Sequence, residues 1–312
     1  MKNKHNMQDE APVKKQFVVK HVGRVLRVAY SADGSKIMSL ARNIVYVWDA
    51  RTAVCERTLY VTEGTYVFVF SSDMKVMVTL ANEGARVWNV ATGLCEKTLR
   101  LDTHGGGCIA MSPDNVTFAV AGGERELFIC SAETGACENT LEFDESFIRC
   151  LAFSQDGSML VSGRSDCRLM LWDVAKGTYK ILRHEWNGYI SGIAVSRDNG
   201  LIVSSAGGNL YVSDAVARKQ IRRIWPRVGI IDRFALSPSG KEVVFVADDG
   251  TVWLWDIQRD QCLKAFKLDP RNAVSVALSP DGKTCACGFD DCNMYVFDAA
   301  TLEIKEREPA KL

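Results

Sequence analysis

The sequence has no apolar run close to the length that a membrane-spanning helix requires. Such a helix needs about 18 or more consecutive apolar residues, and no segment of the 312-residue chain approaches that length. Residues 1–15 are polar and lack the apolar stretch of a signal peptide. We therefore predict no membrane association, no secretion, a cytoplasmic or nuclear location, and a flexible N-terminal tail at 1–15.

The sequence also has no excess of charge and very little histidine. The 38 Lys and Arg residues balance the 38 Asp and Glu residues, so no overall field attracts polyanions, which disfavours a general nucleic-acid-binding protein. The four histidines are scattered and show no i, i+4 pair: His5, His21, His104 and His184. No G-x-S-x-G nucleophile motif is present. We therefore expect no enzymatic activity and no cofactor.

The chain does contain one short pattern repeated seven times. Each copy has an apolar run, a Ser-x-Asp turn or a close variant, a second apolar run, and a third that ends near Trp-Asp. The turn serines are Ser31, Ser71, Ser112, Ser154, Ser196, Ser237 and Ser279. Their spacing is 40–42 residues, which is typical of a propeller blade of four strands. The pattern predicts an all-β, seven-bladed β-propeller with four antiparallel strands per blade.

Within each repeat, the strands become more polar from the first to the fourth. The first strands are expected at 25–30, 66–70, 107–111, 148–153, 190–195, 231–236 and 273–278. The third strands are apolar, as in IVYVWD at 44–49, whereas the fourth strands are more polar, as in VCERTL at 54–59. This gradient is typical of inner strands packed between neighbouring blades and of an outer strand that faces water. We predict a single propeller over residues 16–308, followed by a C-terminal tail at 309–312.

Two segments have the character of the strand that would complete the last blade. One is QFVVKH at 16–21, and the other is TLEIKERE at 301–308. Seven places therefore have eight candidate fourth strands. We favour 16–21, because this segment runs in register into the first blade and would join the two ends of the chain.

The third strands carry a recognisable dipeptide. It is intact at Trp48-Asp49, Trp172-Asp173 and Trp255-Asp256, and altered at Trp88-Asn89, Cys130-Ser131, Ser213-Asp214 and Phe297-Asp298. The chain thus resembles the WD-repeat β-propeller family over about residues 16–308. The turn aspartate of that family corresponds to Asp166, Asp249 and Asp291, whereas only His21 falls at its histidine position. The resemblance implies a structural role for these residues and identifies no particular subfamily.

The cysteines suggest packing rather than cross-linking. Of eleven cysteines, four recur a few residues after the third strand: Cys55, Cys95, Cys137 and Cys262. We interpret this place as a small apolar packing position, and without a secretory signal we expect reduced thiols. Cys285, Cys287 and Cys292 are close in sequence, but no histidine lies near them. Zinc sites usually have paired knuckles or added histidines, so we expect no metal site.

The position five residues before each turn serine is expected to place one side chain per blade at the upper mouth of the central channel. These residues are Leu26, Tyr66, Gly107, Arg149, Ser191, Asp232 and Val274. The side chains of Tyr66, Arg149 and Asp232 suit contact with a polar, oriented peptide. Packing or filling of the channel is the alternative interpretation for each of them.

Two tryptophans, Trp186 and Trp225, lie outside the recurring position, in segments that join a fourth strand to the next blade. In the family that the chain resembles, these loops lie on the face that commonly binds peptides. Exposed Trp, Tyr and Arg side chains are typical anchors of protein interfaces. Both tryptophans are therefore candidate partner-binding residues.

Two stretches carry charge of one sign. The basic run at 218–227 contains Arg218, Lys219, Arg222, Arg223 and Arg227 around Trp225, and the acidic run at 131–147 contains Glu133, Glu138, Glu142, Asp144 and Glu145. The simplest interpretation is a solvated outer strand in each case. A functional interpretation is a dipolar surface on which an acidic segment docks, or a basic run that contacts RNA phosphates and stacks a base.

We conclude from the sequence that the protein is a non-catalytic protein–protein interaction scaffold or adaptor subunit of a larger complex. Other proteins or peptide segments would bind its upper face. The candidate partner-binding residues are Tyr66, Arg149, Trp186, Trp225, Arg227 and Asp232. The alternative is an RNA- or ribonucleoprotein-associated subunit that uses the basic run at 218–227.

Overall fold

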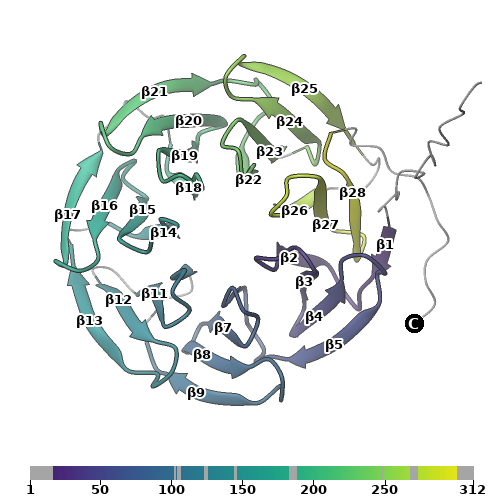
Figure 1. Ribbon diagram of the computed structural model, residues 1–312, viewed down its shortest axis with the longest axis vertical. Coiled ribbons are helices and arrows are strands. Elements are labelled where there is room, and N and C mark those ends of the chain that lie inside the picture. Colours follow the sequence, from purple (N-terminus) through teal and green to yellow (C-terminus); the bar gives the residue numbers. More distant parts are fainter. Residues whose placement is uncertain are drawn as a thin grey trace, which may run out of the picture.

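The computed structural model describes residues 17–101, 103, 107–122, 126–143, 146–182, 188–247, 249–267 and 273–300. All regular secondary structure in these residues is β, and the 28 strands form seven four-stranded antiparallel sheets. Figure 1 shows the sheets as blades around a common centre. The prediction of a seven-bladed β-propeller with four antiparallel strands per blade is confirmed. The predicted tails at 1–15 and 309–312 lie outside the described residues.

The first four blades each use four consecutive strands, from the centre outward. Blade one comprises β2 (Val25–Tyr30), β3 (Lys36–Ala41), β4 (Ile44–Asp49) and β5 (Cys55–Tyr60). Blade two comprises β6 (Val67–Phe70), β7 (Val76–Ala81), β8 (Gly84–Asn89) and β9 (Cys95–Leu99). Blade three comprises β10 (Ile109–Met111), β11 (Thr117–Ala121), β12 (Glu126–Ser131) and β13 (Cys137–Glu142). Blade four comprises β14 (Ile148–Phe153), β15 (Met159–Arg164), β16 (Leu169–Asp173) and β17 (Thr178–Leu182).

The last three blades include the one that joins the two ends of the chain. Blade five comprises β18 (Ile190–Val195), β19 (Leu201–Ala206), β20 (Asn209–Asp214) and β21 (Lys219–Ile224). Blade six comprises β22 (Ile231–Leu236), β23 (Glu242–Ala247), β24 (Val252–Asp256) and β25 (Gln261–Phe266). Blade seven comprises β26 (Ala273–Leu278), β27 (Thr284–Phe289), β28 (Asn293–Asp298) and, as its outer strand, β1 (Phe17–Lys20).

The ring is closed by the antiparallel pairing of β1 with β28, in which Phe17 lies opposite Val296 and Val19 lies opposite Met294. The preference for 16–21 as the closing segment is therefore confirmed, while 301–308 lies outside the described residues. Val19 is only 4% exposed and packs in the apolar cluster between blades seven and one, with Val25 and Trp48. Because β1 leads directly into β2, the closing strand ties the first blade to the last.

The recurring Ser-x-Asp turn has a hydrogen-bonding function in every blade that retains it. In blade one, the Ser31 hydroxyl donates to Asp33 at 2.6 Å and accepts the backbone N–H of Lys36 at 2.9 Å. Asp33 in turn accepts the backbone N–H of Ser35 at 2.9 Å. The hydrogen bond from Ser31 is the largest of several effects that lower the pKa of the Asp33 carboxyl. The motif recurs because it ties both ends of a tight turn between the first and second strands.

Three of the four recurring tryptophans, Trp48, Trp88 and Trp172, bind the third strand of their blade to its second strand, whereas Trp255 donates to Asp260 at 3.2 Å. The indole N–H of Trp48 donates to the Ser39 hydroxyl at 2.8 Å, and Trp172 donates to Ser162 at 2.9 Å. In blade one, His21 also contacts the Ser39 hydroxyl at 2.6 Å, so the closing segment joins this network. Arg42 stands where the turn aspartate of the family would be, so in blade one the histidine, serine and tryptophan are linked without that aspartate.

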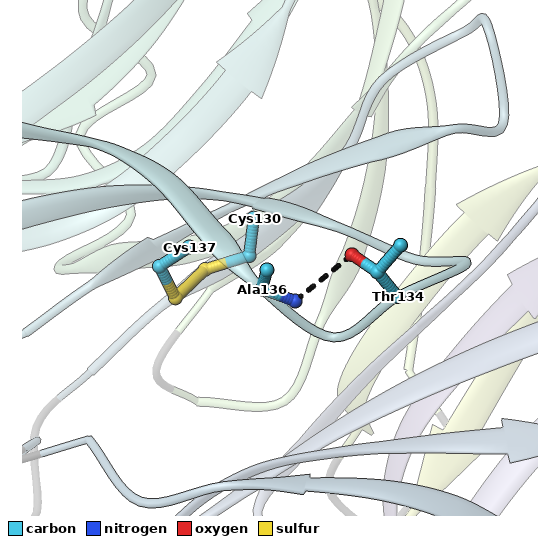
Figure 2. Close-up of a disulfide and its surroundings, with 4 residues drawn as sticks. All are labelled: Cys130, Thr134, Ala136 and Cys137. Atoms are coloured by element: carbon cyan, nitrogen blue, oxygen red, sulfur yellow. Dashed lines mark hydrogen bonds between the residues drawn. A yellow bond between two sulfur atoms is a disulfide. The ribbon is translucent and has the colours of Figure 1, made fainter.

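The interpretation of the recurring cysteines as apolar packing positions is wrong. Cys95 and Cys262 are exposed and Cys55 is half-buried. In the fourth strand, a β-bulge directly follows each of them. Each of these cysteines lies opposite the tryptophan of its blade, whereas in blade three that position is Cys130. Cys130 and Cys137 form a disulfide between β12 and β13 (Figure 2), so the expectation of reduced thiols is also wrong for this pair.

Ring closure can be tested with two substitutions in the same strand. Val19→Asp places a charge in the apolar cluster between blades seven and one, and we expect it to lower the free energy of unfolding by about 3 kcal/mol or more. Lys20→Asp changes an exposed neighbour and should shift it by less than about 0.5 kcal/mol. Urea unfolding of both variants gives the comparison, and equal effects would contradict the closing role of β1.

His21 should make the stability of the ring depend on pH. Burial lowers the pKa of His21 from 6.5 to about 4. Between these values the unfolded chain binds a proton that the folded chain excludes, so the contribution of His21 is complete above pH 6.5 and is lost as the pH falls toward 4. We expect wild type to lose about 2 kcal/mol more than His21→Gln between pH 7 and pH 5. Equal losses in urea unfolding at the two pH values would show that His21 does not titrate in this way.

Candidate functional site

The upper face is the face on which the fourth strand of one blade leads into the first strand of the next. Among the described residues, five large apolar side chains are exposed on these connections: Val22, Phe147, Tyr189, Trp225 and Ile230. Those exposed at the turns of the opposite, lower face are aliphatic: Val54, Leu94, Val116 and Val216. The connections of the upper face therefore combine aromatic and aliphatic exposure, which is typical of a binding surface.

The centre of the ring contains a cavity of about 370 Å³, which we call the channel mouth. It is lined by the first strands of blades one to six, and the inner strands surround the centre of the ring in Figure 1. Its polar and charged lining consists of Arg27, Tyr66, Arg149, Tyr189, Ser191 and Arg233. A cavity of this size is within the usual range for small-ligand sites.

Three arginines give the channel mouth its electrostatic character. The guanidinium of Arg149 lies over the ring of Tyr189, with 4.3 Å between its central carbon and the ring centroid. Burial, and after it the positive charge of Arg233, lower the pKa of Arg27 to about 10. Arg27 therefore remains cationic at neutral pH. The described lining residues include no carboxylate.

The structure brings together two of the predicted partner-binding residues, Tyr66 and Arg149, at the channel mouth. Ser191 also lines it, but its hydroxyl is already within 2.9 Å of the Ser205 hydroxyl and 3.1 Å of the carbonyl oxygen of Ile231. Asp232 is the second residue of β22, and its side chain lies outside the described part of the protein. Trp186 lies outside the described residues altogether.

Arg27, Arg233 and Tyr189 were not predicted from the sequence as residues of the channel mouth. Arg27 and Arg233 lie four residues before their turn serines, one position later than the residues expected to face the channel. In blades one, four, five, six and seven the first strand has a β-bulge at this point, as between Val25 and Arg27. A bulge interrupts the alternation of a strand, and in blade one the residue after the bulge, Arg27, lines the channel mouth in place of Leu26. An arginine four or five residues before a turn serine would have indicated the channel mouth in the sequence.

A second cluster, which we call the rim cluster, lies where β21 ends and consists of Arg223, Trp225 and Arg227. Trp225 is 58% exposed. The guanidinium carbons of Arg223 and Arg227 lie 5.6 and 4.7 Å from its ring centroid. Arg223 is held by a 3.0 Å hydrogen bond from its Nε to Asn209. The structure therefore places two more predicted residues, Trp225 and Arg227, in one cation–π group.

The basic run at 218–227 does not form a continuous charged stripe. Arg218 lies in the turn before β21, at the lower end of that strand, whereas Arg227 follows its upper end. Arg222 is 3.9 Å from the carboxylate of Asp260 in blade six. Only Arg223 and Arg227 join Trp225 on the upper side. The length of the run in the sequence therefore overstates the surface that it offers to a polyanion.

The described residues contain no group of three or more His, Cys, Asp or Glu side chains that could hold a metal ion. The Cys285 and Cys287 sulfurs lie 4.0 Å apart on one face of β27, and both cysteines are buried. None of the described segments is a helix long and apolar enough to cross a membrane.

A comparison with protein families identifies two of the repeats. The family described as WD40, or WD domain, G-beta repeat, matches residues 135–173 and 260–298. Each matched segment begins in or just before an outer strand and ends at the dipeptide of the next third strand, Trp172-Asp173 in one case and Phe297-Asp298 in the other. Propellers of this family are generally protein-interaction scaffolds and are typically non-catalytic.

The positive charge around Trp225 in the rim cluster can be tested by quenching its fluorescence with ions of opposite sign. Because cations flank Trp225, we expect iodide to quench its fluorescence roughly twofold more effectively than caesium at low ionic strength. Arg227→Gln should reduce this preference, whereas Arg51→Gln, an exposed residue of a lower turn, should leave it unchanged. Equal preference in all three proteins would contradict the arrangement.

Proposed function

Because the chain is a WD-repeat β-propeller with exposed aromatic side chains on one face, we propose that it is a non-catalytic interaction scaffold whose upper face binds a partner protein. The proposal rests above all on the rim cluster. Trp and Arg are the residues most often found at the energetic centres of interfaces, and here both belong to one exposed group. The fold itself supplies a rigid frame and does not specify the partner.

The path of the chain at blade five supports binding across the upper face. Residues 225–230 connect β21, the outermost strand of blade five, to β22, the innermost strand of blade six (Figure 1). Trp225, Arg227 and Ile230 on this connection are all exposed, and Arg233 on β22 lines the channel mouth. An extended segment could therefore follow one connection from the rim inward.

The charge of the rim cluster favours a partner segment with an acidic residue beside an apolar one. Arg223 and Arg227 lie on Trp225, so the ring offers apolar area and the guanidinium edges offer hydrogen-bond donors. Carboxylates form strong, charge-assisted hydrogen bonds with such donors. The cation–π contacts and the hydrogen bond to Asn209 hold these side chains before binding, which reduces the entropy lost on association.

Association with RNA is the second candidate function. The contact of Arg227 with an exposed tryptophan favours it, because base stacking on Trp and cation–π contacts from Arg support binding of single strands. The division of the basic run between the two faces of the propeller gives this alternative less support than the protein scaffold has.

The proposed function is tested by affinity purification from the native cell with mass spectrometry. We expect Trp225→Ala/Arg227→Ala to lose at least one stable partner by about tenfold or more. Leu94→Ala/Arg51→Ala removes an exposed apolar side chain and an exposed arginine from the lower face and should keep the partners. Thermal unfolding of both variants should match wild type.

Two outcomes would count against the scaffold proposal. An unchanged partner set in Trp225→Ala/Arg227→Ala would remove the rim cluster from the binding surface. Loss of all partners after ribonuclease treatment of the wild-type complex would favour the RNA-associated alternative, and the recovery of partners should then fall steeply with salt concentration.

A further inference from the structure

Arg27 brings a positive charge into the channel mouth without a counter-ion. This side chain on β2 lines the cavity and is partly buried. It forms no hydrogen bond or ion pair with any residue that the structure describes. Burial, and after it the charge of Arg233, lower the pKa of Arg27 to about 10, so the guanidinium stays charged at neutral pH. Since charged side chains are normally buried only when they are paired, this unpaired cation indicates an anionic ligand.

Arg149 on β14 supplies further hydrogen-bond donors to the same cavity. Its guanidinium carbon lies 4.3 Å from the centroid of the Tyr189 ring. This cation–π contact restrains the side chain but gives its N–H groups no acceptor oxygen. Arg149 is exposed, so these donors are accessible to a ligand. Arg233 has an interaction of its own within the protein, and the site does not depend on it.

Arg27 and Arg149 act on one part of the cavity although they come from different blades. The strands that carry them, β2 and β14, face each other across the centre of the ring (Figure 1). Both charges reach the thiol of Cys108, which also lines the cavity. Burial is the largest effect on this thiol and raises its pKa, and the two arginines oppose that increase. A small anion in the cavity can therefore lie close to both cations.

A ligand with a single negative charge fits the site best. Arg27 is the one described arginine of the lining that is both withdrawn from water and unpaired, since Arg149 is exposed and Arg233 has its own interaction. Apolar side chains also line the cavity, among them Ile193 and Phe234. The cost of moving an ion out of water rises with its charge, so a carboxylate enters such a cavity at a lower cost than a dianionic phosphate does.

We propose that the channel mouth binds a single carboxylate group of a peptide, carried by an acidic side chain or by the end of the chain. The oxygens of a carboxylate match the geometry of guanidinium N–H groups, and about 370 Å³ accommodates the group together with its side chain. A peptide is the expected source because β22, which lines the cavity, continues the connection that carries the exposed Trp225 and Ile230. In this respect the inference rests on the proposed function, to which it adds the chemical group that is recognised.

The experiment is a calorimetric titration of the full-length protein with three capped amino acids. N-acetylglutamate α-amide carries a carboxylate on its side chain, N-acetylleucine carries one at the chain end, and N-acetylglutamine amide carries none. We expect saturable binding of at least one of the first two, and the tighter of them identifies the source of the carboxylate. Arg149→Gln should weaken this binding roughly tenfold or more. Arg197→Gln, which removes an exposed arginine from a lower turn, is the matched control and should bind as wild type does.

The inference is overturned if neither carboxylate binds better than N-acetylglutamine amide, or if Arg149→Gln and Arg197→Gln weaken binding equally. Tighter binding of N-acetylphosphoserine amide than of either carboxylate would also overturn it, because the site would then take a dianion. Trp225→Ala/Arg227→Ala should bind the carboxylates normally. Loss of partners in that variant, without carboxylate binding in wild type, would refute this inference and retain the proposed function, and the opposite pair of results would do the reverse.

A second variant links the site to stability. Arg27→Gln should raise the melting temperature of the free protein, because it removes a desolvated charge beside Arg233. It should also abolish the increase in melting temperature that the bound carboxylate gives to wild type. A lower melting temperature together with an undiminished effect of the carboxylate would show that Arg27 is a structural residue and would contradict its role in the site.

Discussion

The pairing of β1 with β28 is the constraint on which the rest of this structure depends. A propeller blade buries its two faces only against its neighbours, so a ring with one open junction would expose the apolar faces of blades one and seven. Four residues, Phe17–Lys20, complete the outer strand of blade seven. The chain then continues through His21, whose contact with Ser39 connects the closing segment to Trp48 of blade one.

Closure also positions the two candidate sites. The channel mouth exists only because six first strands converge on one axis, and Arg27 in blade one faces the same cavity as Arg149 in blade four. The rim cluster is local by comparison, since it is assembled by β21 and the connection that follows. The propeller therefore offers two surfaces of different chemistry on one side: an exposed tryptophan held by arginines, and a cationic cavity at the centre.

Much of the fold was predictable from the sequence because its signals are local and repeated. The serine of each turn makes hydrogen bonds within five residues of itself, as Ser31 does with Asp33 and Lys36, and so it leaves a periodic trace. The candidate sites depend on features that leave no such trace. The β-bulge next to Arg27 and Arg233 is not visible in the apolar pattern. Each arginine lies one position after the residue that was predicted to face the channel, and so neither was predicted. The exposure of Cys95 and the disulfide at Cys137 were mispredicted for the same reason, since a second bulge turns that position.

The most direct test of the account is to ask which face of the propeller touches a partner inside the cell. A photo-reactive phenylalanine analogue placed at Ile230 on the upper face, and separately at Leu94 on the lower face, replaces an exposed apolar residue in each case. We predict that irradiation joins a specific protein to the chain from position 230 and not from position 94. Cross-linking from position 94 alone would contradict the assignment of the upper face as the binding surface.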